Sequence, residues 1–315
     1  MPVQVRRTAQ QEARARATIS PNPPAIYGAI VTHHPERGLP ERAARLALQV
    51  GGLIIVDNGS SPSGIALAEE AARLTGAHLV ANPGNRGIAT ALNQAARLAM
   101  SLGSDWLITM DQDTSACPTM VTELARAYRD CPFRDDVAVV GAGVAGAPAP
   151  GCDNTSWTEQ TLVITSGSLV SLPILEAAGG FRDDFYMDYV DVEYCLRLRE
   201  RGYRVIITCA PVMRHRIGKP TRHRFLSRRP VTTNHSAARR YYMTRNRLTL
   251  WLRYWRTEKA WVKYDLAWFL RETLKIALFE QDRGAKLRAV TAGIRDAVLR
   301  RNGARRSARE ASPHS

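Results

Sequence analysis

The chain has 315 residues, 45% of them hydrophobic and 23% charged, which is the balance of a globular protein able to bury a full core. No apolar run is long enough to cross a bilayer, and none follows the N-terminal arginines as it would in a secretory signal. These features argue against an integral membrane protein or a disordered chain, and we expect a cytoplasmic protein.

The formal net charge of +15 is unevenly distributed. From Arg201 onward there are 28 Lys and Arg against 7 Asp and Glu, whereas the first 200 residues hold 16 against 22. A basic C-terminal part predicts contact with something anionic, such as lipid head groups, nucleic acid or a phosphorylated acceptor.

The five cysteines are widely spaced, odd in number and show no zinc-binding spacing. This pattern predicts free thiols in a reducing compartment rather than a disulfide scaffold.

The first 24 residues are polar and rich in arginine, which predicts a disordered basic arm. Short apolar strands and periodic helices then alternate. Strands are expected at 25–32, 52–60, 77–82 and 105–111, and helices at 40–50, 65–75 and 89–103. This order predicts an α/β fold with a parallel sheet and helices on both faces.

Further along, the elements are less regular. We expect a strand within 137–150, one or two strands in 161–172, short helices at 173–178 and 191–201, and a strand at 204–209. Residues 237–299 are helical in pattern almost throughout. The predicted organisation is a basic arm (1–24), a catalytic domain (25–232), a basic amphipathic helical extension (233–300) and a disordered tail (301–315).

The most informative segment is LITMDQDT, residues 107–114. It has the pattern of a buried strand that ends in Asp111, Gln112 and Asp113, and the carboxyl end of a parallel strand is a common ligand site. Two carboxylates there suit a divalent metal that holds a phosphate-bearing substrate. A solvated acidic loop is the alternative.

Two other strands end in polar loops. Asp57 and Asn58 follow the second strand, where a carboxylate could accept a hydrogen bond from a nucleobase or ribose, although Asn-Gly also favours a plain turn. The segment 82–87, Asn-Pro-Gly-Asn-Arg-Gly, precedes a helix whose first N–H groups could face an anion, with Arg86 near a phosphate. An ordinary strand-to-helix connection is equally compatible with that segment.

Acidic residues gather near the start of the predicted helix at 191–201. Asp188, Asp191 and Glu193 cannot all share one helix face, so one could cap the helix and another could be a general base. His215, just after the 204–209 strand, could ligate a metal or contact a diphosphate.

Taken in order, these motifs resemble family 2 glycosyltransferases of the GT-A fold, and bacterial rhamnosyltransferases in particular. The resemblance covers about residues 25–250. Its motifs are Thr32-His33-His34, Asp57-Asn58-Gly59-Ser60, residues 82–87 with Asn93, Asp111-Gln112-Asp113, Gly179-Gly180-Phe181, residues 188–191 with Cys195-Leu196-Arg197, residues 215–218, and His235 with 240–242 and Arg245-Asn246.

The resemblance implies a GT-A type, mixed and mostly parallel sheet flanked by helices, with a C-terminal helical extension. It also implies residue roles. The nucleotide-sugar pocket would be lined by Thr32, Asp57, Asn58, Asn82, Gly84, Asn85, Arg86, Gly87, Asp111 and Gln112. Mg²⁺ or Mn²⁺ would be held by Asp113, with Asp111 and His215. Asp191 would be the catalytic base, with Asp188 as its rival.

The activity implied is inverting transfer of a sugar, L-rhamnose from dTDP-rhamnose, onto a glycan or lipid-linked acceptor in cell-surface polysaccharide synthesis. Galactofuranose or another hexose is the alternative sugar. A sugar-1-phosphate nucleotidyltransferase and a non-enzymatic membrane- or nucleic-acid-binding module are less favoured functions.

Aromatic, basic and aliphatic residues interleave at helical spacing in 251–281. This segment predicts either a helix docked on an anionic membrane, at the inner face of the plasma membrane, or a helical subdomain with a solvated basic face. No nucleic-acid-binding motif accompanies the charge, so no nucleic acid partner is expected.

Overall fold

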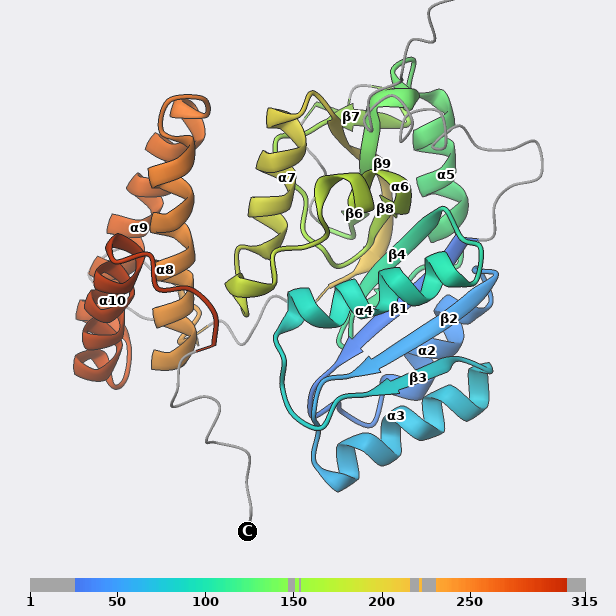
Figure 1. Ribbon diagram of the computed structural model, residues 1–315, viewed down its shortest axis with the longest axis horizontal. Helices are drawn as coiled ribbons and strands as arrows, with labels where there is room; N and C mark the ends of the chain where they lie inside the picture. The colour runs from blue at the N-terminus through green and yellow to red at the C-terminus, as the bar shows by residue number, and fades with distance from the viewer. Residues whose placement is uncertain (1–25, 147–150, 153, 216–220, 223–230, 305–315) are drawn as a thin grey trace, which may run out of the picture. The chain divides into compact units, whose positions relative to one another are not determined.

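The computed structural model describes residues 26–146, 151–152, 154–215, 221–222 and 231–304 (Figure 1). The chain divides into two compact units. Unit 1 holds residues 1–183 and 190–215, and unit 2 holds residues 184–189 and 216–315. The predicted basic arm and nearly all of the predicted tail fall outside the described residues, and the predicted domain boundaries stay predictions.

Unit 1 is built on one mixed sheet with the order β3-β2-β1-β4-β8-β6-β9-β5, in which β7 also pairs with β9. The strands are β1 (Ile26–Thr32), β2 (Gly52–Asp57), β3 (His78–Ala81), β4 (Trp106–Asp111), β5 (Ser115–Ala116), β6 (Val137–Val144), β7 (Trp157–Glu159), β8 (Ser168–Ser171) and β9 (Arg204–Arg214). The run β3-β2-β1-β4 is parallel, whereas β8 is antiparallel to β4 and β6. The predicted α/β class is confirmed.

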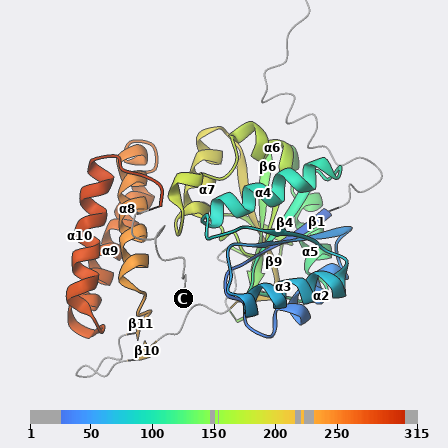
Figure 2. The ribbon, with the colours of Figure 1, turned by 60° about the horizontal axis from the view of Figure 1, so that its bottom comes forward.

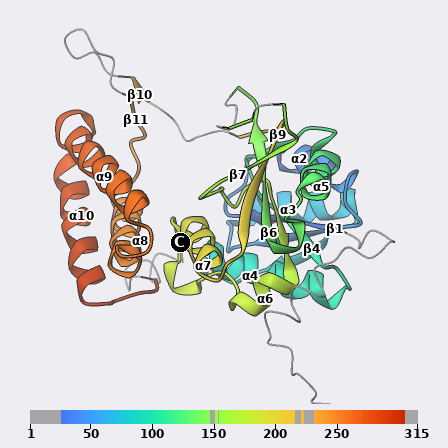
Figure 3. The same ribbon diagram turned by 90° about the horizontal axis from the view of Figure 1, so that it is seen from above.

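Helices cover both faces of this sheet (Figures 2 and 3). On one side lie α2 (Leu39–Ala47), α3 (Pro62–Thr75) and α5 (Met120–Asp130), and on the other α4 (Ile88–Ser101), α6 (Leu172–Ala178) and α7 (Val190–Glu200). The first group buries Leu39, Leu46 and Leu124 in the main hydrophobic core with alternate strand residues such as Ile30 and Ile108. Burial on both faces explains why β1, β2 and β4 are continuous apolar runs in the sequence.

The connections create a reversal of strand order next to β1. The chain first adds β2 and β3 on one side of β1, then returns through α4 to place β4 on the other side. In such sheets ligands bind at the carboxyl ends of the strands where the order reverses. Thr32, Asp57 and Asp111 end the three strands around this point.

The structure corrects the prediction that all five cysteines are free. Cys152 and Cys209 form a disulfide, while Cys117, Cys131 and Cys195 are free. The two partners are 57 residues apart, so nothing in their spacing indicated the pair. They meet because β7, which follows Cys152, pairs with β9, which contains Cys209.

Two other predicted elements differ. Residues 161–167 do not form a strand, and only 168–171 of the segment 161–172 joins the sheet, as β8. The strand predicted at 204–209 continues to Arg214, because β5 and β6 supply partners along its second half.

Unit 2 consists of α8 (Ala237–Tyr254), α9 (Lys259–Phe279) and α10 (Arg283–Val298), with a two-stranded sheet of β10 (Thr221–Arg222) and β11 (Val231–Thr232). Its interior is rich in buried ion pairs. Arg240 binds Glu280 (2.7 Å) and Glu272 (3.2 Å), and Arg247 binds Glu272 (3.0 Å). Among the described helices, none is long and apolar enough to cross a membrane.

Candidate active site

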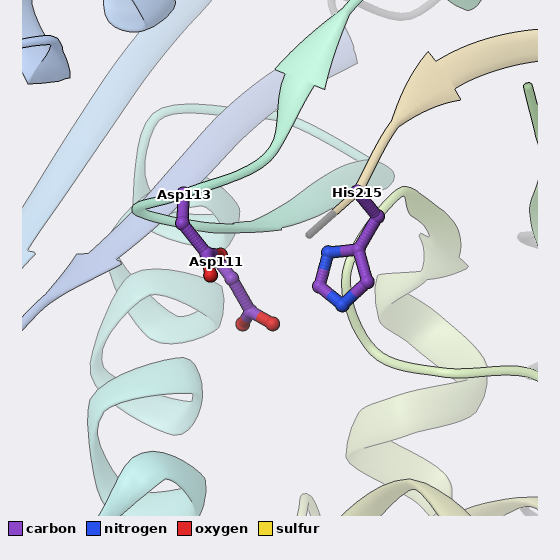
Figure 4. A group of neighbouring side chains, drawn as sticks. All are labelled: Asp111, Asp113 and His215. Carbon is purple, nitrogen blue, oxygen red and sulfur yellow. The ribbon is translucent and has the colours of Figure 1, made fainter. Parts of the chain in front are cut away.

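Asp111, Asp113 and His215 come together at the carboxyl edge of the sheet, as Figure 4 shows. One ligand atom from each residue lies within 4.8 Å of the others. Asp111 ends β4, Asp113 lies in the turn that follows, and His215 comes directly after β9. Asp113 is exposed and the other two are half-buried, so an ion could reach all three from solvent.

Strand pairing brings His215 to the two aspartates. After Asp113 the chain forms the short strand β5, whose Ser115 pairs with Arg214 and whose Ala116 pairs with Met213. The residue that follows β9 must therefore lie beside the turn that precedes β5.

Two hydroxyl groups behind the carboxylates hold this arrangement. Thr114 Oγ1 lies 2.7 Å from His215 Nδ1 and 2.7 Å from Ser166 Oγ, and Ser166 Oγ accepts a hydrogen bond from the Asp111 backbone N–H (3.0 Å). A hydrogen bond to one ring nitrogen fixes a histidine for ligation through the other. Sequence reasoning gave Thr114 and Ser166 no role.

Asp57 is buried, with 1% of its surface exposed, and its carboxylate is already engaged. It accepts hydrogen bonds from Thr32 Oγ1 (2.8 Å), Ser60 Oγ (2.5 Å) and the Ser60 backbone N–H (2.9 Å). A carboxylate has about four acceptor positions, and the described residues fill three of those of Asp57.

The loop after β2 packs directly on the loop at 82–87. Asn58 donates to Asn85 Oδ1 (3.1 Å) and Gly87 O (3.2 Å), and its own Oδ1 accepts from Asn82 Nδ2 (3.2 Å) and the Arg86 N–H (3.0 Å). The amides of these residues therefore build the loops, while the Arg86 side chain is exposed.

Gly59 permits this close approach. Its φ is +81°, and a Cβ at this position would lie 2.5 Å from the backbone of Gly84. Only glycine fits both the backbone conformation and the space.

Gln112 joins β1 to the metal-site turn. Its side chain accepts a hydrogen bond from the His33 N–H (2.8 Å) and donates one to His33 O (3.1 Å). Its backbone carbonyl accepts one from Arg42 Nε (2.6 Å). Burial, followed by the neighbouring His34, lowers the pKa of His33. The Gln112 side chain thus positions the loop.

Asp191 lies in the first turn of α7 and lines a small cavity with Thr109 and Thr165. Thr109 is two residues before Asp111 on β4, so Asp191 shares this cavity with the strand that carries the metal candidate. In contrast, Glu193 is 2% exposed and held by Arg197 (2.8 Å). Burial raises the pKa of the adjacent Cys195 thiol to about 12, which leaves it a neutral packing group.

Arg197 also fixes the turn before the acidic segment. It donates to the carbonyls of Ala178 and Gly180 (2.7 Å), and Asn93 of α4 bonds Phe181 N–H (2.8 Å) and O (2.8 Å). These bonds explain why Asn93, Gly179-Gly180-Phe181 and Arg197 occur together: they hold the chain that leads into 184–191.

Asp188 and Asp191 belong to different units. Asp188 belongs to unit 2, where Arg239 binds its carboxylate through Nε (3.0 and 3.1 Å) and Nη2 (2.8 Å). Its side chain is only 14% exposed. Asp188 is an ion-pair anchor in this structure.

The backbone around Asp188 is strained and clamped by α8. Tyr186, Asp188 and Tyr189 all have positive φ (56°, 58° and 63°), which non-glycine residues seldom adopt. The Asn246 amide donates to the carbonyls of Phe185 (2.8 Å), Met187 (2.8 Å) and Asp188 (2.9 Å). Asn246 belongs to a motif of the resemblance, but the sequence did not indicate that it contacts this segment.

Comparison with known proteins identifies the domain that carries these loops. The family model described as glycosyl transferase family 2 matches residues 30–145, which run from the end of β1 through β6 and include both aspartates of the metal candidate. The resemblance to family 2 glycosyltransferases is thus confirmed over residues 30–145. A curated relative of this chain is the dTDP-rhamnosyl transferase RfbF of Shigella flexneri, 28% identical over 244 residues, which cover 71% of this chain and 79% of that protein.

Solved structures show the same GT-A fold. The chain matches the mannosyltransferase PcManGT from Pyrobaculum calidifontis in complex with GDP-Man and Mn²⁺, with a TM-score of 0.54, 15% identity and coverage of 93% and 95% of the two chains. It also matches S. aureus TarS 1-349 in complex with UDP-GlcNAc, with a TM-score of 0.56, 14% identity and coverage of 87% and 81%. At this identity the likeness concerns the fold.

Proposed function

We propose that the glycosyltransferase transfers L-rhamnose from dTDP-rhamnose, with inversion at the anomeric carbon and with the help of a divalent metal. The observation that carries this proposal is the cluster of Asp111, Asp113 and His215 where the strand order reverses. The name of the Shigella relative supports the choice of donor.

The residues present fit a divalent cation. Two carboxylates and one imidazole converge, and oxygen ligands with one nitrogen suit Mn²⁺ well and Mg²⁺ acceptably. Asp113, Asp111 and His215 would hold the ion, which when bound would offset the charge of the donor diphosphate as the nucleoside diphosphate leaves. The PcManGT structure, which contains Mn²⁺ and GDP-Man, supports the same use of this fold.

The two loops beside the metal site would bind the nucleotide. The remaining acceptor position of Asp57 would meet a nucleobase or ribose donor, with Thr32 and Ser60 orienting the carboxylate. The exposed Arg86 would meet a phosphate at the N-terminus of α4. Asn58, Asn82, Asn85 and Gly87 would shape the pocket through the hydrogen bonds described above.

Asp191 would act as the general base. Its carboxylate would take the proton from the acceptor hydroxyl while that oxygen forms the new bond to the anomeric carbon and the bond to the diphosphate oxygen breaks. Asp188 is the weaker candidate, because Arg239 occupies its carboxylate.

We further propose a glycan or lipid-linked acceptor in cell-surface polysaccharide synthesis, which would place the enzyme at the inner face of the plasma membrane as a peripheral protein. The basic helices of unit 2 support this part of the proposal.

A donor panel tests the assignment. The chain with Mn²⁺ should release nucleoside diphosphate from dTDP-rhamnose, but not from UDP-galactofuranose, UDP-glucose or GDP-mannose, and the acid-liberated sugar of a captured product should be rhamnose. Turnover of one of the other donors alone would overturn the sugar and leave the transferase class intact. No turnover of any donor with a mixture of bacterial glycolipid acceptors would overturn the proposal.

A further inference from the structure

The outward face of α9 carries a stripe of leucines that the fold leaves exposed. Leu266, Leu270, Leu274 and Leu278 are spaced by four residues and are 41%, 59%, 60% and 52% exposed. Residues at this spacing lie on one side of a helix, one above the other. Over about 18 Å of helix length, an apolar strip therefore faces solvent.

Two aromatic side chains of α9 are also exposed. The exposed fraction is 69% for Tyr264 and 46% for Trp268. Exposed Tyr and Trp are typical of surfaces that meet the boundary between water and an apolar phase.

Charges on α9 are sorted by side. The basic residues Lys259, Lys263 and Arg271 are exposed. The acidic residues point inward, where Asp265 contacts Arg247 (3.1 Å) and Glu272 contacts Arg247 (3.0 Å) and Arg240 (3.2 Å). The exposed side of α9 is therefore apolar and positive, with no exposed acidic residue on this helix.

This combination selects one kind of partner. In a symmetric dimer through α9, the like charges of two such faces would meet without an acidic residue of α9 to pair with them. A nucleic acid would offer phosphates but nothing apolar for the leucines. An anionic bilayer offers both an apolar phase and negative head groups.

We propose that α9 docks in the plane of an anionic phospholipid membrane, with Leu266, Leu270, Leu274 and Leu278 inserted at the head-group boundary and Lys259, Lys263 and Arg271 on the lipid phosphates. The biological reason for this docking rests on the proposed function, since a lipid-linked acceptor lies at a membrane. Its physical basis is α9 alone.

Vesicle binding by the full chain tests the proposal without any donor or acceptor. At about 0.15 M salt, the protein should co-sediment with phosphatidylcholine vesicles that contain about 30% phosphatidylglycerol, and not with phosphatidylcholine alone. Binding should weaken at least about tenfold in Leu270→Ser/Leu274→Ser. It should weaken about fivefold for each charge removed in Lys263→Gln and Arg271→Gln.

Matched controls come from unit 1. Leu48, at the end of α2, and Leu74 of α3 are 88% and 66% exposed, so Leu48→Ser/Leu74→Ser should leave vesicle binding unchanged. Arg73→Gln/Arg97→Gln removes two exposed charges and should have a much smaller effect than the α9 pair. Circular dichroism and thermal unfolding should show that each variant remains folded.

Three results would overturn the proposal: no binding to anionic vesicles, equal binding by Leu270→Ser/Leu274→Ser, or a wild-type dimer that this variant converts to a monomer in light scattering. The last would assign the leucine stripe to a second copy of the chain. Because Asp113→Asn should bind vesicles like the wild type, failure of the membrane proposal is distinguishable from failure of the proposed transferase chemistry.

Discussion

At the scale of single residues, Asp113 should be the side chain on which metal use depends most. It is the exposed member of the cluster, so its replacement should disturb the fold little. Asp113→Asn should lower turnover with saturating Mn²⁺ by at least about 100-fold and leave the unfolding temperature within a degree or so. Glu70→Gln, an exposed carboxylate on α3, is the matched control and should be silent. Full activity of Asp113→Asn would remove this residue from the metal site.

Substitution of the two candidate bases should have different effects. Asp191→Asn should lower kcat by about 10² to 10⁴ with little change in donor binding, because it removes a proton acceptor. Asp188→Asn should instead lower the free energy of unfolding by about 1 kcal/mol, since it weakens the ion pair with Arg239. Chemical denaturation and pre-steady-state kinetics on both variants measure these effects. The reverse pattern would make Asp188 the base.

The sequence alone indicated some of these residues and not others. Asp111 and Asp113 stood out because two carboxylates ended an apolar strand. His215 could be suspected but not placed, because its position depends on the pairing of β5 with β9. Ser166 had no signal, since a serine in a polar segment has no distinguishing pattern until Asp111 and Thr114 are seen to contact it.

At the scale of elements, the contact between the 57–60 and 82–87 loops depends on one glycine. Gly59→Ala should lower the free energy of unfolding by about 2–4 kcal/mol. The alanine would have to keep a positive φ, and its methyl group would collide with the Gly84 backbone. Gly76 has φ +68°, but a Cβ there would meet nothing within 4 Å, so Gly76→Ala should cost only about 1 kcal/mol. Equal costs for the two substitutions, by urea denaturation, would show that the loops do not pack as described.

A second element-scale prediction concerns the clamp from α8 to residues 185–188. Asn246→Ala leaves three carbonyls without their amide donor, and should cost about 2 kcal/mol or more of unfolding free energy. Because Asp191 follows this segment by three residues, we also expect a lower kcat at unchanged KM for donor. The control is Thr249→Ala, which removes the hydrogen bond from Thr249 Oγ1 to the Arg245 carbonyl within α8. An unchanged kcat of Asn246→Ala at saturating donor would show that the clamp contributes to stability and not to catalysis.

The parallel half of the sheet was predictable because burial on both faces produces strong apolar runs, each followed by a helix. Three other features could not be predicted: the short β5, the second half of β9 and the Cys152–Cys209 disulfide. Each depends on pairing between segments far apart in the chain, and local periodicity contains no information about such partners.

At the scale of the whole molecule, stability should depend on pH through the half-buried His235. Burial, followed by the charges of Arg239 and Arg240, lowers the pKa of His235 from its usual 6.5. The unfolded chain then binds more protons than the folded chain around and below pH 6.5, so the free energy of unfolding should fall as pH is lowered through this range. Thermal unfolding between pH 8 and 5 should show a shallower decline in His235→Gln. An identical decline would assign the effect to other groups.

The uneven charge of the chain has a structural counterpart. Unit 2, which contains most of the basic C-terminal part, hides acidic Glu272, Glu280 and Asp265 in ion pairs and keeps basic residues such as Lys263 and Arg271 exposed. Composition predicted a basic surface, but only the structure shows that the leucines of α9 share it.

Metal-dependent binding of a nucleotide sugar at the carboxyl edge of the sheet is tested most directly by calorimetric titration with dTDP-rhamnose. We expect binding in the presence of Mn²⁺, at least about tenfold weaker binding after chelation with EDTA, and the same weakening in Asp113→Asn even with Mn²⁺. Equal affinity in all three titrations would contradict the metal site, and no binding of dTDP-rhamnose in any of them would contradict the proposed donor.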